Sequence, residues 1–180
     1  MRRIFTLGLA VAVTTTAFAD VPTDIQDRGV AATVRVTDAA DTTGGSGVII
    51  ARSGGHAYVL TAQHVAPKAE TVEVRTIRGK PVKAEVLARS AQADLAVLRF
   101  AAADLPAPVT LGAIGKTPEQ VIGVGWEEGV TPTAQTEEIK GTLQLRRPGE
   151  ATTVRCWEVV RPPAKGRSGG PLIEDRKSVV

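Results

Sequence analysis

Three polar residues of this chain have the types needed for nucleophilic catalysis. Ser168 lies in the glycine-rich stretch GRSGGPL, His64 follows the apolar stretch YVLTAQ, and Asp94 leads directly into LAVLRF. A serine hydroxyl is a weak nucleophile that needs a base within hydrogen-bonding distance. An imidazole can act as that base near neutral pH, and a carboxylate can hold the imidazole in the required tautomer. The sequence therefore contains a candidate Ser-His-Asp triad.

The glycines around Ser168 indicate a second catalytic element. Glycine adopts backbone angles that other residues resist, so GRSGGP can form a tight turn and let a substrate approach closely. Such a turn can aim the N–H groups of Gly166 and Ser168 at one point and so form an oxyanion hole. One donor of this kind contributes roughly 2.7–4 kcal/mol of transition-state stabilisation. Each motif is weak by itself, and only their combination makes the prediction specific.

The other candidate residues favour structural roles. His56 lies in the turn SGGHAY, where a solvent-exposed polar role is expected. Cys156, the single cysteine, lies in the alternating stretch TTVRCWEV and is interpreted as a buried packing residue rather than a nucleophile. A single cysteine excludes an internal disulfide. No paired Cys/His spacing and no phosphate-binding glycine loop is found, so we expect no metal and no cofactor.

The N-terminus has the features of a secretory signal peptide. A basic MRR start precedes IFTLGLAVAV, which is too short to span a bilayer comfortably, and the small-x-small pattern AFA follows. We predict a signal peptide over residues 1–19 and a mature start at Asp20. The protein would then be secreted or periplasmic, with no stable membrane association after cleavage. An uncleaved N-terminal anchor is the alternative.

Charge gives little indication of a nucleic-acid partner. Removal of the two arginines of MRR lowers the basic residues from 22 to 20 against 19 acidic residues, which leaves a net charge of +1. The chain also has no basic stripe interleaved with aromatic residues, so nucleic-acid binding is not expected.

Strand patterns dominate the remaining sequence. Six short stretches rich in β-branched residues and bounded by Gly, Pro, Asp or Ser lie at residues 30–36, 46–51, 57–62, 71–77, 82–88 and 95–100. Beyond a proline-containing linker, further strands are predicted at residues 120–125, 138–146, 152–159, 170–174 and 178–180. No stretch after the signal peptide has a sustained helical period. We therefore expect an all-β fold.

The spacing of these strands is typical of small β-barrels. We expect two barrels in series, the first over residues 20–107 with His64 and Asp94, and the second over residues 108–180 with Ser168. Gly54 and Gly55 predict a hairpin between the second and third strands.

Taken together, TAQHV, ADLAVLRF and GRSGGPL resemble the His, Asp and Ser blocks of the trypsin-like serine proteases, in the chain order of that family. The short separations between the His, Asp and Ser blocks, together with the run GSGVII…YVLTAQHV, are most similar to the bacterial HtrA/DegP-type branch. The resemblance implies two six-stranded antiparallel β-barrels with the triad in the cleft between them. It also implies endopeptidase activity on protein or peptide substrates without a cofactor.

Two positions depart from the trypsin pattern. Trypsins have an aspartate directly before the nucleophile, which pairs with a new N-terminus on activation; here that residue is Arg167, so no activation of that kind is expected. The residue at the base of the family's specificity pocket is Pro162, which suggests a preference for small or apolar side chains. Lys165 and Arg167 could instead contact acidic residues of a substrate.

The segment after Ser168 is short for the fold that the resemblance implies. PLIEDRKSVV supplies one strand, a polar turn and the start of a return strand. We therefore expect an incomplete second barrel and a sequence that is a fragment of a longer one, with a decayed gene as the alternative. A non-catalytic peptide-binding module on the same scaffold is the alternative to a protease. The oligomeric state does not follow from the sequence.

Overall fold

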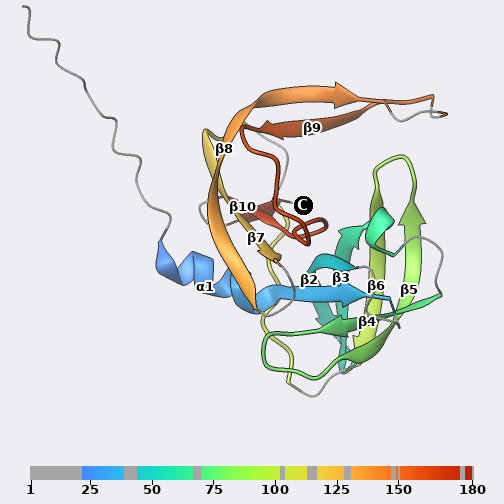
Figure 1. Cartoon of the computed structure of the whole chain (residues 1–180). Coiled ribbons are helices and arrows are strands. Elements are labelled where there is room, and N and C mark those ends of the chain that lie inside the picture. Colours follow the sequence, from blue (N-terminus) through green and yellow to red (C-terminus); the bar gives the residue numbers. More distant parts are fainter. Residues whose placement is uncertain are drawn as a thin grey trace, which may run out of the picture.

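The computed structural model describes residues 22–38, 44–66, 70–101, 104–112, 117–127, 131–146, 149, 151–174 and 177–179. The predicted signal peptide lies outside these residues. The described chain is mostly β and forms one closed barrel and a separate five-stranded sheet (Figure 1). The expected all-β class with an incomplete second barrel is therefore confirmed. No helix within the described ranges is long and apolar enough to cross a membrane.

The closed barrel is built from the first six strands, all joined to antiparallel neighbours in the order β1-β2-β3-β6-β5-β4. Their bounds are β1 (Thr33–Thr37), β2 (Gly44–Ser53), β3 (His56–Ala62), β4 (Thr71–Arg75), β5 (Val82–Ser90) and β6 (Leu95–Ala101). Alternate residues point inward, so Val34, Val36, Val59 and Leu98 are fully buried. Because the inward side chains are mostly β-branched and short, they fill a small barrel without aromatic bulk.

The predicted hairpin between β2 and β3 is present. Gly54 and Gly55 have φ angles of 56° and 77°, and Ser53 pairs with His56 across the turn. Two successive positive φ angles are those of a type I′ turn, whose twist matches that of the flanking strands.

The second sheet has the order β11-β10-β7-β8-β9. Its strands are β7 (Gln120–Trp126), β8 (Pro132–Leu145), β9 (Val154–Val159), β10 (Leu172–Glu174) and β11 (Lys177–Val179). β8 is the longest, and its outer part forms with β9 a hairpin that extends away from the rest of the sheet (Figure 1). The predicted return strand is present, since β11 pairs with β10.

One sequence prediction at the start of the fold is wrong. The strand expected at residues 30–36 begins only at Thr33, because α1 (Thr23–Ala32) precedes it. The buried positions of α1 are Ile25, Gly29 and Ala32, two of which have little or no side chain. The hydrophobic residues of α1 therefore do not repeat with a helical period, whereas the valines that follow α1 alternate as in a strand.

The small side of α1 allows close packing on the second sheet. A side-chain carbon at Gly29 would lie 3.3 Å from a methyl group of Val124 and would overlap Ile173. Ile25 completes this cluster, which also contains Ile122. α1 thus leads into the barrel but is held by the other sheet.

Trp126, at the end of β7, joins the two halves of the fold. It is 3% exposed, its indole N–H donates to the Thr33 carbonyl at 3.5 Å, and the Arg75 guanidinium lies 4.8 Å from its ring centroid. A cation over an indole face at this distance is attracted to the ring electrons. β1 and β4 of the barrel are therefore tied to the end of β7, the central strand of the second sheet, beside the site described next.

Candidate active site

His64 and Asp94 are held together at the end of two paired strands. η1 (Gln63–Val65) is a single turn that follows β3, and Asp94 directly precedes β6. Ala62 and Leu95 are register partners in the β3–β6 pair, so the residues just beyond them are brought side by side. The two sequence motifs thus meet because their flanking apolar strands are neighbours in the barrel.

Three hydrogen bonds join Asp94 to η1. The His64 ring Nδ1 lies 2.7 Å from one carboxylate oxygen of Asp94, and the His64 backbone N–H donates to the other at 3.0 Å. The Gln63 N–H donates to the Asp94 carbonyl at 2.9 Å. Asp94 has a φ of 55°, a left-handed conformation that is uncommon outside glycine but tolerated by aspartate. The three bonds fix this conformation.

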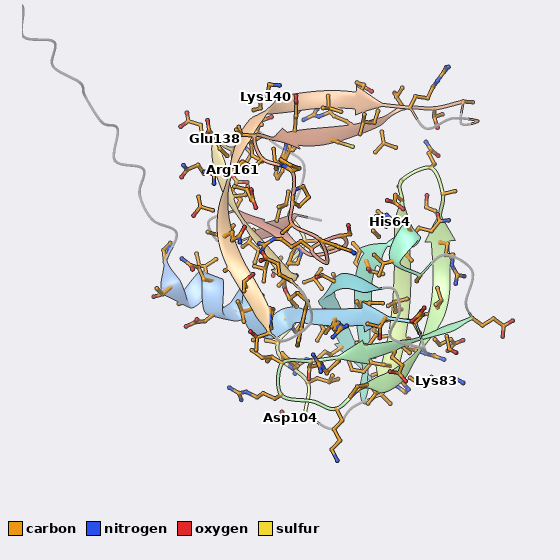
Figure 2. The ribbon with its side chains drawn as sticks, in the orientation of Figure 1. His64, Lys83, Asp104, Glu138, Lys140 and Arg161 are labelled. Carbon is orange, nitrogen blue, oxygen red and sulfur yellow. The ribbon has the colours of Figure 1, made fainter. Side chains whose placement is uncertain are left out.

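The pair differs in exposure in a way that suits catalysis. The His64 side chain is 55% exposed, whereas that of Asp94 is 17% exposed. His64 lies at the edge of the barrel that faces the second sheet (Figure 2). A carboxylate on Nδ1 favours the tautomer with the proton on that nitrogen, which leaves Nε2 free to accept a proton.

Ser168 lies in a loop of two consecutive turns between β9 and β10. The Arg167 N–H donates to the Ala164 carbonyl at 3.2 Å, and the Gly170 N–H donates to the Arg167 carbonyl at 2.9 Å. Gly166 and Gly169 have φ angles of 93° and 83°. Both glycines are therefore required by the backbone of the turns, as the sequence analysis predicted.

The loop lies directly against β2 of the barrel. The Ser46 N–H donates to the Ser168 carbonyl at 2.7 Å, and a side-chain carbon at Gly45 would lie 2.7 Å from the same oxygen. A side-chain carbon at Gly169 would lie 2.7 Å from the Ala62 nitrogen, near the start of η1. These glycines let the serine loop pack against β2 and the end of β3, which directly precedes the turn that carries His64.

The groups predicted to act in catalysis are not all bonded to one another. Among the described residues, Ser168 Oγ makes no hydrogen bond to the His64 ring, and the N–H groups of Gly166 and Ser168 donate to no acceptor. Nucleophile–base bonds are often long before substrate binds. N–H groups without an acceptor are the kind of donor that an oxyanion hole requires.

Ser46 is a site residue that the sequence analysis missed. It is fully buried. Its hydroxyl donates to the Gly166 carbonyl at 2.8 Å and accepts from the backbone N–H of Trp126 at 2.8 Å. Together with its backbone bond to Ser168, it binds the serine loop on both sides of Arg167 and ties it to both halves of the fold. The sequence pattern predicts Ser46 only as the first residue of a strand and gives no sign of a role for its hydroxyl.

The predicted substrate-binding residues lie on the surface. Both are exposed; Pro162 lies between β9 and the serine loop, and Lys165 lies within the first turn of that loop. The expectation that Arg167 could contact a substrate is wrong, because its side chain is 3% exposed and bound to Glu127.

The remaining candidates of the sequence have local roles. The His56 ring is hydrogen-bonded to the Gly54 carbonyl at 2.9 Å in the hairpin turn. Cys156 is only partly buried, with its sulfur 3.8 Å from the Val154 carbonyl oxygen. Within the part of the chain that the structure describes, no three His, Cys, Asp or Glu residues are grouped so that they could hold a metal ion.

A sequence profile of the trypsin-like peptidase domain matches residues 45–180. The chain belongs to this family. The match covers η1, Asp94 and the serine loop, and the relatives named below place the chain in the HtrA branch of the family.

Two curated relatives and one solved structure describe the similarity. A "Probable periplasmic serine endoprotease DegP-like" of Hahella chejuensis is 32% identical over 140 residues, covering 76% of this chain and 28% of the relative. A "Serine protease Do-like HtrA" of Lactococcus lactis is 31% identical over 144 residues, covering 76% and 35%. The crystal structure of a serine endoprotease from Yersinia pestis superposes with a TM-score of 0.68 at 27% identity, covering 88% of this chain and 57% of that one. The chain thus spans about a third of the length of the curated relatives that it matches.

Proposed function

We propose that this chain carries the catalytic machinery of a serine endopeptidase that cleaves protein substrates. Ser168 is the nucleophile, His64 the general base and acid, and Asp94 the carboxylate that orients His64. The N–H groups of Gly166 and Ser168 form the oxyanion hole. The observation that carries the proposal is the His64–Asp94 pair, with Nδ1 on a carboxylate at 2.7 Å and the ring open to solvent.

The reaction would proceed through an acyl-enzyme. Ser168 Oγ attacks the scissile carbonyl carbon while His64 Nε2 takes the hydroxyl proton, and the carbonyl oxygen gains its negative charge between the two N–H groups. His64 then gives the proton to the leaving amine as the C–N bond breaks. Water attacks the resulting ester, losing its proton to His64, and Ser168 is released with its hydrogen restored.

Labelling with a fluorophosphonate probe tests this assignment. The parent chain should react covalently at Ser168, and Ser168→Ala should abolish the labelling. Ser178→Ala, which removes a serine of β11 outside the serine loop, is the matched control and should keep the label. Equal labelling of the parent and Ser168→Ala would refute the assignment.

A non-catalytic peptide-binding module is the second candidate. It is favoured by the absence, among the described residues, of a hydrogen bond between Ser168 Oγ and the His64 ring. Peptide binding by a folded chain that neither labels nor cleaves would support it over the protease.

We further infer that the protein is exported and acts on sites flanked by small or apolar residues. Export is supported by the pattern of residues 1–19 and by the word periplasmic in the name of the Hahella relative. N-terminal sequencing of the protein from a bacterial periplasm should begin at Asp20. Cleavage of a peptide library should favour small or apolar residues, since Pro162 supplies no carboxylate for Lys or Arg.

A further inference from the structure

Arg167, the residue directly before the nucleophile, is fixed at its charged end. Its Nη1 lies 2.5 Å from a Glu127 carboxylate oxygen and donates to the Thr133 hydroxyl at 3.0 Å, while Nη2 donates to the Gly123 carbonyl. The guanidinium is a planar group with several donors, and here donors on both arms are used. The side chain is 3% exposed, against 28% for Glu127, so the pair is shielded on the arginine side.

Glu127 is fixed as well. The oxygen that binds Arg167 also accepts from the Thr133 hydroxyl at 3.2 Å and from the Gln135 amide at 3.0 Å. Thr133 and Gln135 are the register partners of Gly125 and Gly123 in the β7–β8 pair. The carboxylate is therefore tied to β8, on the side of the sheet that receives the arginine.

The aliphatic part of Arg167 runs along two glycines of β7. A side-chain carbon at Gly125 would lie 2.8–2.9 Å from the Cα, Cβ and Cγ atoms of Arg167, and one at Gly123 would lie 3.4 Å from Nη2. A side chain at Gly125 would occupy the space of the arginine, and one at Gly123 would press on its guanidinium end and on Glu137. The sequence GVG in β7 is thus matched to an arginine at position 167.

The backbone of Arg167 is also fully engaged, since its N–H and its carbonyl each close one turn of the serine loop. Arg167 stands between Gly166 and Ser168, the two residues whose N–H groups form the proposed oxyanion hole. Fixing its backbone and side chain limits the rotation of the peptide groups on either side. A loop with several glycines otherwise has many conformations to lose on ordering.

We propose that Arg167 is a positioning residue, and that its ion pair with Glu127 holds the two oxyanion donors in place from behind the nucleophile. This inference rests on the proposed function. In trypsins the residue before the nucleophile is paired with a new chain terminus. Here Arg167 of the serine loop is paired with Glu127, which directly follows β7. This pairing of the residue before the nucleophile requires no new chain terminus.

The test compares the parent chain with Glu127→Gln, Arg167→Met and the double variant. We measure the second-order rate of fluorophosphonate labelling, kcat and KM on a peptide that the parent cleaves, and the midpoint of thermal unfolding. Each single variant should label at least tenfold more slowly, with the loss in kcat rather than in KM. Arg167→Lys, which keeps the charge but not the second arm, should restore part of the rate.

The double variant separates positioning from a merely structural role. It leaves no buried charge unpaired, so its unfolding midpoint should return toward that of the parent. Its labelling should nevertheless remain at least tenfold slow, because nothing then holds the loop. Recovery of both stability and labelling in the double variant would overturn the inference. Parent-like labelling of Glu127→Gln would overturn it as well.

Two controls keep this result distinct from the proposed function. Glu85→Gln removes the exposed pair with Arg99 at 2.5 Å in the barrel and should leave the labelling rate unchanged. If the folded parent is not labelled at all, the proposed function fails and hydrogen exchange decides the inference. Faster amide exchange in residues 164–170 of the double variant than in the parent supports it, and equal exchange overturns it.

Discussion

Replacement of Ser46 by alanine should destabilise the fold and slow catalysis together. The hydroxyl of Ser46 is the hydrogen-bond partner of both the Trp126 N–H and the Gly166 carbonyl, each at 2.8 Å. Ser46 is fully buried, so water does not reach it from the surface to replace the lost hydroxyl. Ser46→Ala therefore leaves one donor and one acceptor without a partner.

The size of the effect follows from these two groups. A buried polar group left unpaired costs about 1–3 kcal/mol, so the free energy of unfolding should fall by about 2–6 kcal/mol. One kcal/mol lowers the unfolding midpoint of a domain of this size by about 2–4 °C, so the midpoint should fall by at least about 4 °C. Release of the Gly166 carbonyl also frees the serine loop, and fluorophosphonate labelling should slow by about tenfold, which corresponds to about 1.4 kcal/mol.

Urea and thermal unfolding followed by tryptophan fluorescence measure the first effect. Trp126 is a suitable probe because it is 3% exposed and its own N–H donates to Ser46. Ser53→Ala, at the exposed end of the same strand, is the matched control and should unfold like the parent. If Ser46→Ala unfolds within about 1 °C of Ser53→Ala and labels at the parent rate, the role assigned to the two hydrogen bonds is wrong.

Two further substitutions test the geometry of the site. Asp94→Asn keeps the shape of the side chain but favours the wrong His64 tautomer, so kcat should fall by about 10⁴-fold. The far-ultraviolet circular dichroism spectrum should change little. A loss in kcat below about tenfold would argue against the orienting role of the carboxylate. Gly169→Ala places a methyl group 2.5 Å from Thr61 Oγ1 and forces a φ of 83° on alanine, so both the unfolding midpoint and the labelling rate should drop. Gly54→Ala is the control, because Gly54 has a positive φ but no atom within 4 Å of the added carbon. It should lower the unfolding midpoint alone.

Local patterns were sufficient to predict most of the barrel. The third strand was expected at residues 57–62 and runs from His56 to Ala62, and the fifth was expected at 82–88 and runs from Val82 to Ser90. These strands alternate in side-chain type and end at strong turn residues, so short-range information defines them. β8 begins at Pro132, six residues earlier than expected, because TPTAQTE carries little apolar signal.

The missed features depend on contacts between distant segments. α1 was missed because its buried face contains Gly29 and Ala32, which give no hydrophobic period. The sequence does not predict the partner of Arg167, because Glu127 is 40 residues away. Two consecutive glutamates in EEG are also the pattern of a solvent-exposed loop. The proximity of His64 and Asp94 was predictable only through the resemblance, since spacing alone does not show that β3 and β6 are neighbours.

Helix α1 precedes the barrel in the sequence, whereas its packing partners in the second sheet follow the barrel. Its neighbours Val124 and Ile173 belong to β7 and β10, which leave the ribosome after every strand of the barrel. The barrel strands can pair while Ile25 still lacks its cover, because N-terminal units generally fold first during synthesis. Packing of α1 on the second sheet therefore closes a long loop that contains the whole barrel, and such a closure costs entropy and slows folding. The serine loop directly precedes β10, so its ordering depends on the same long-range contact.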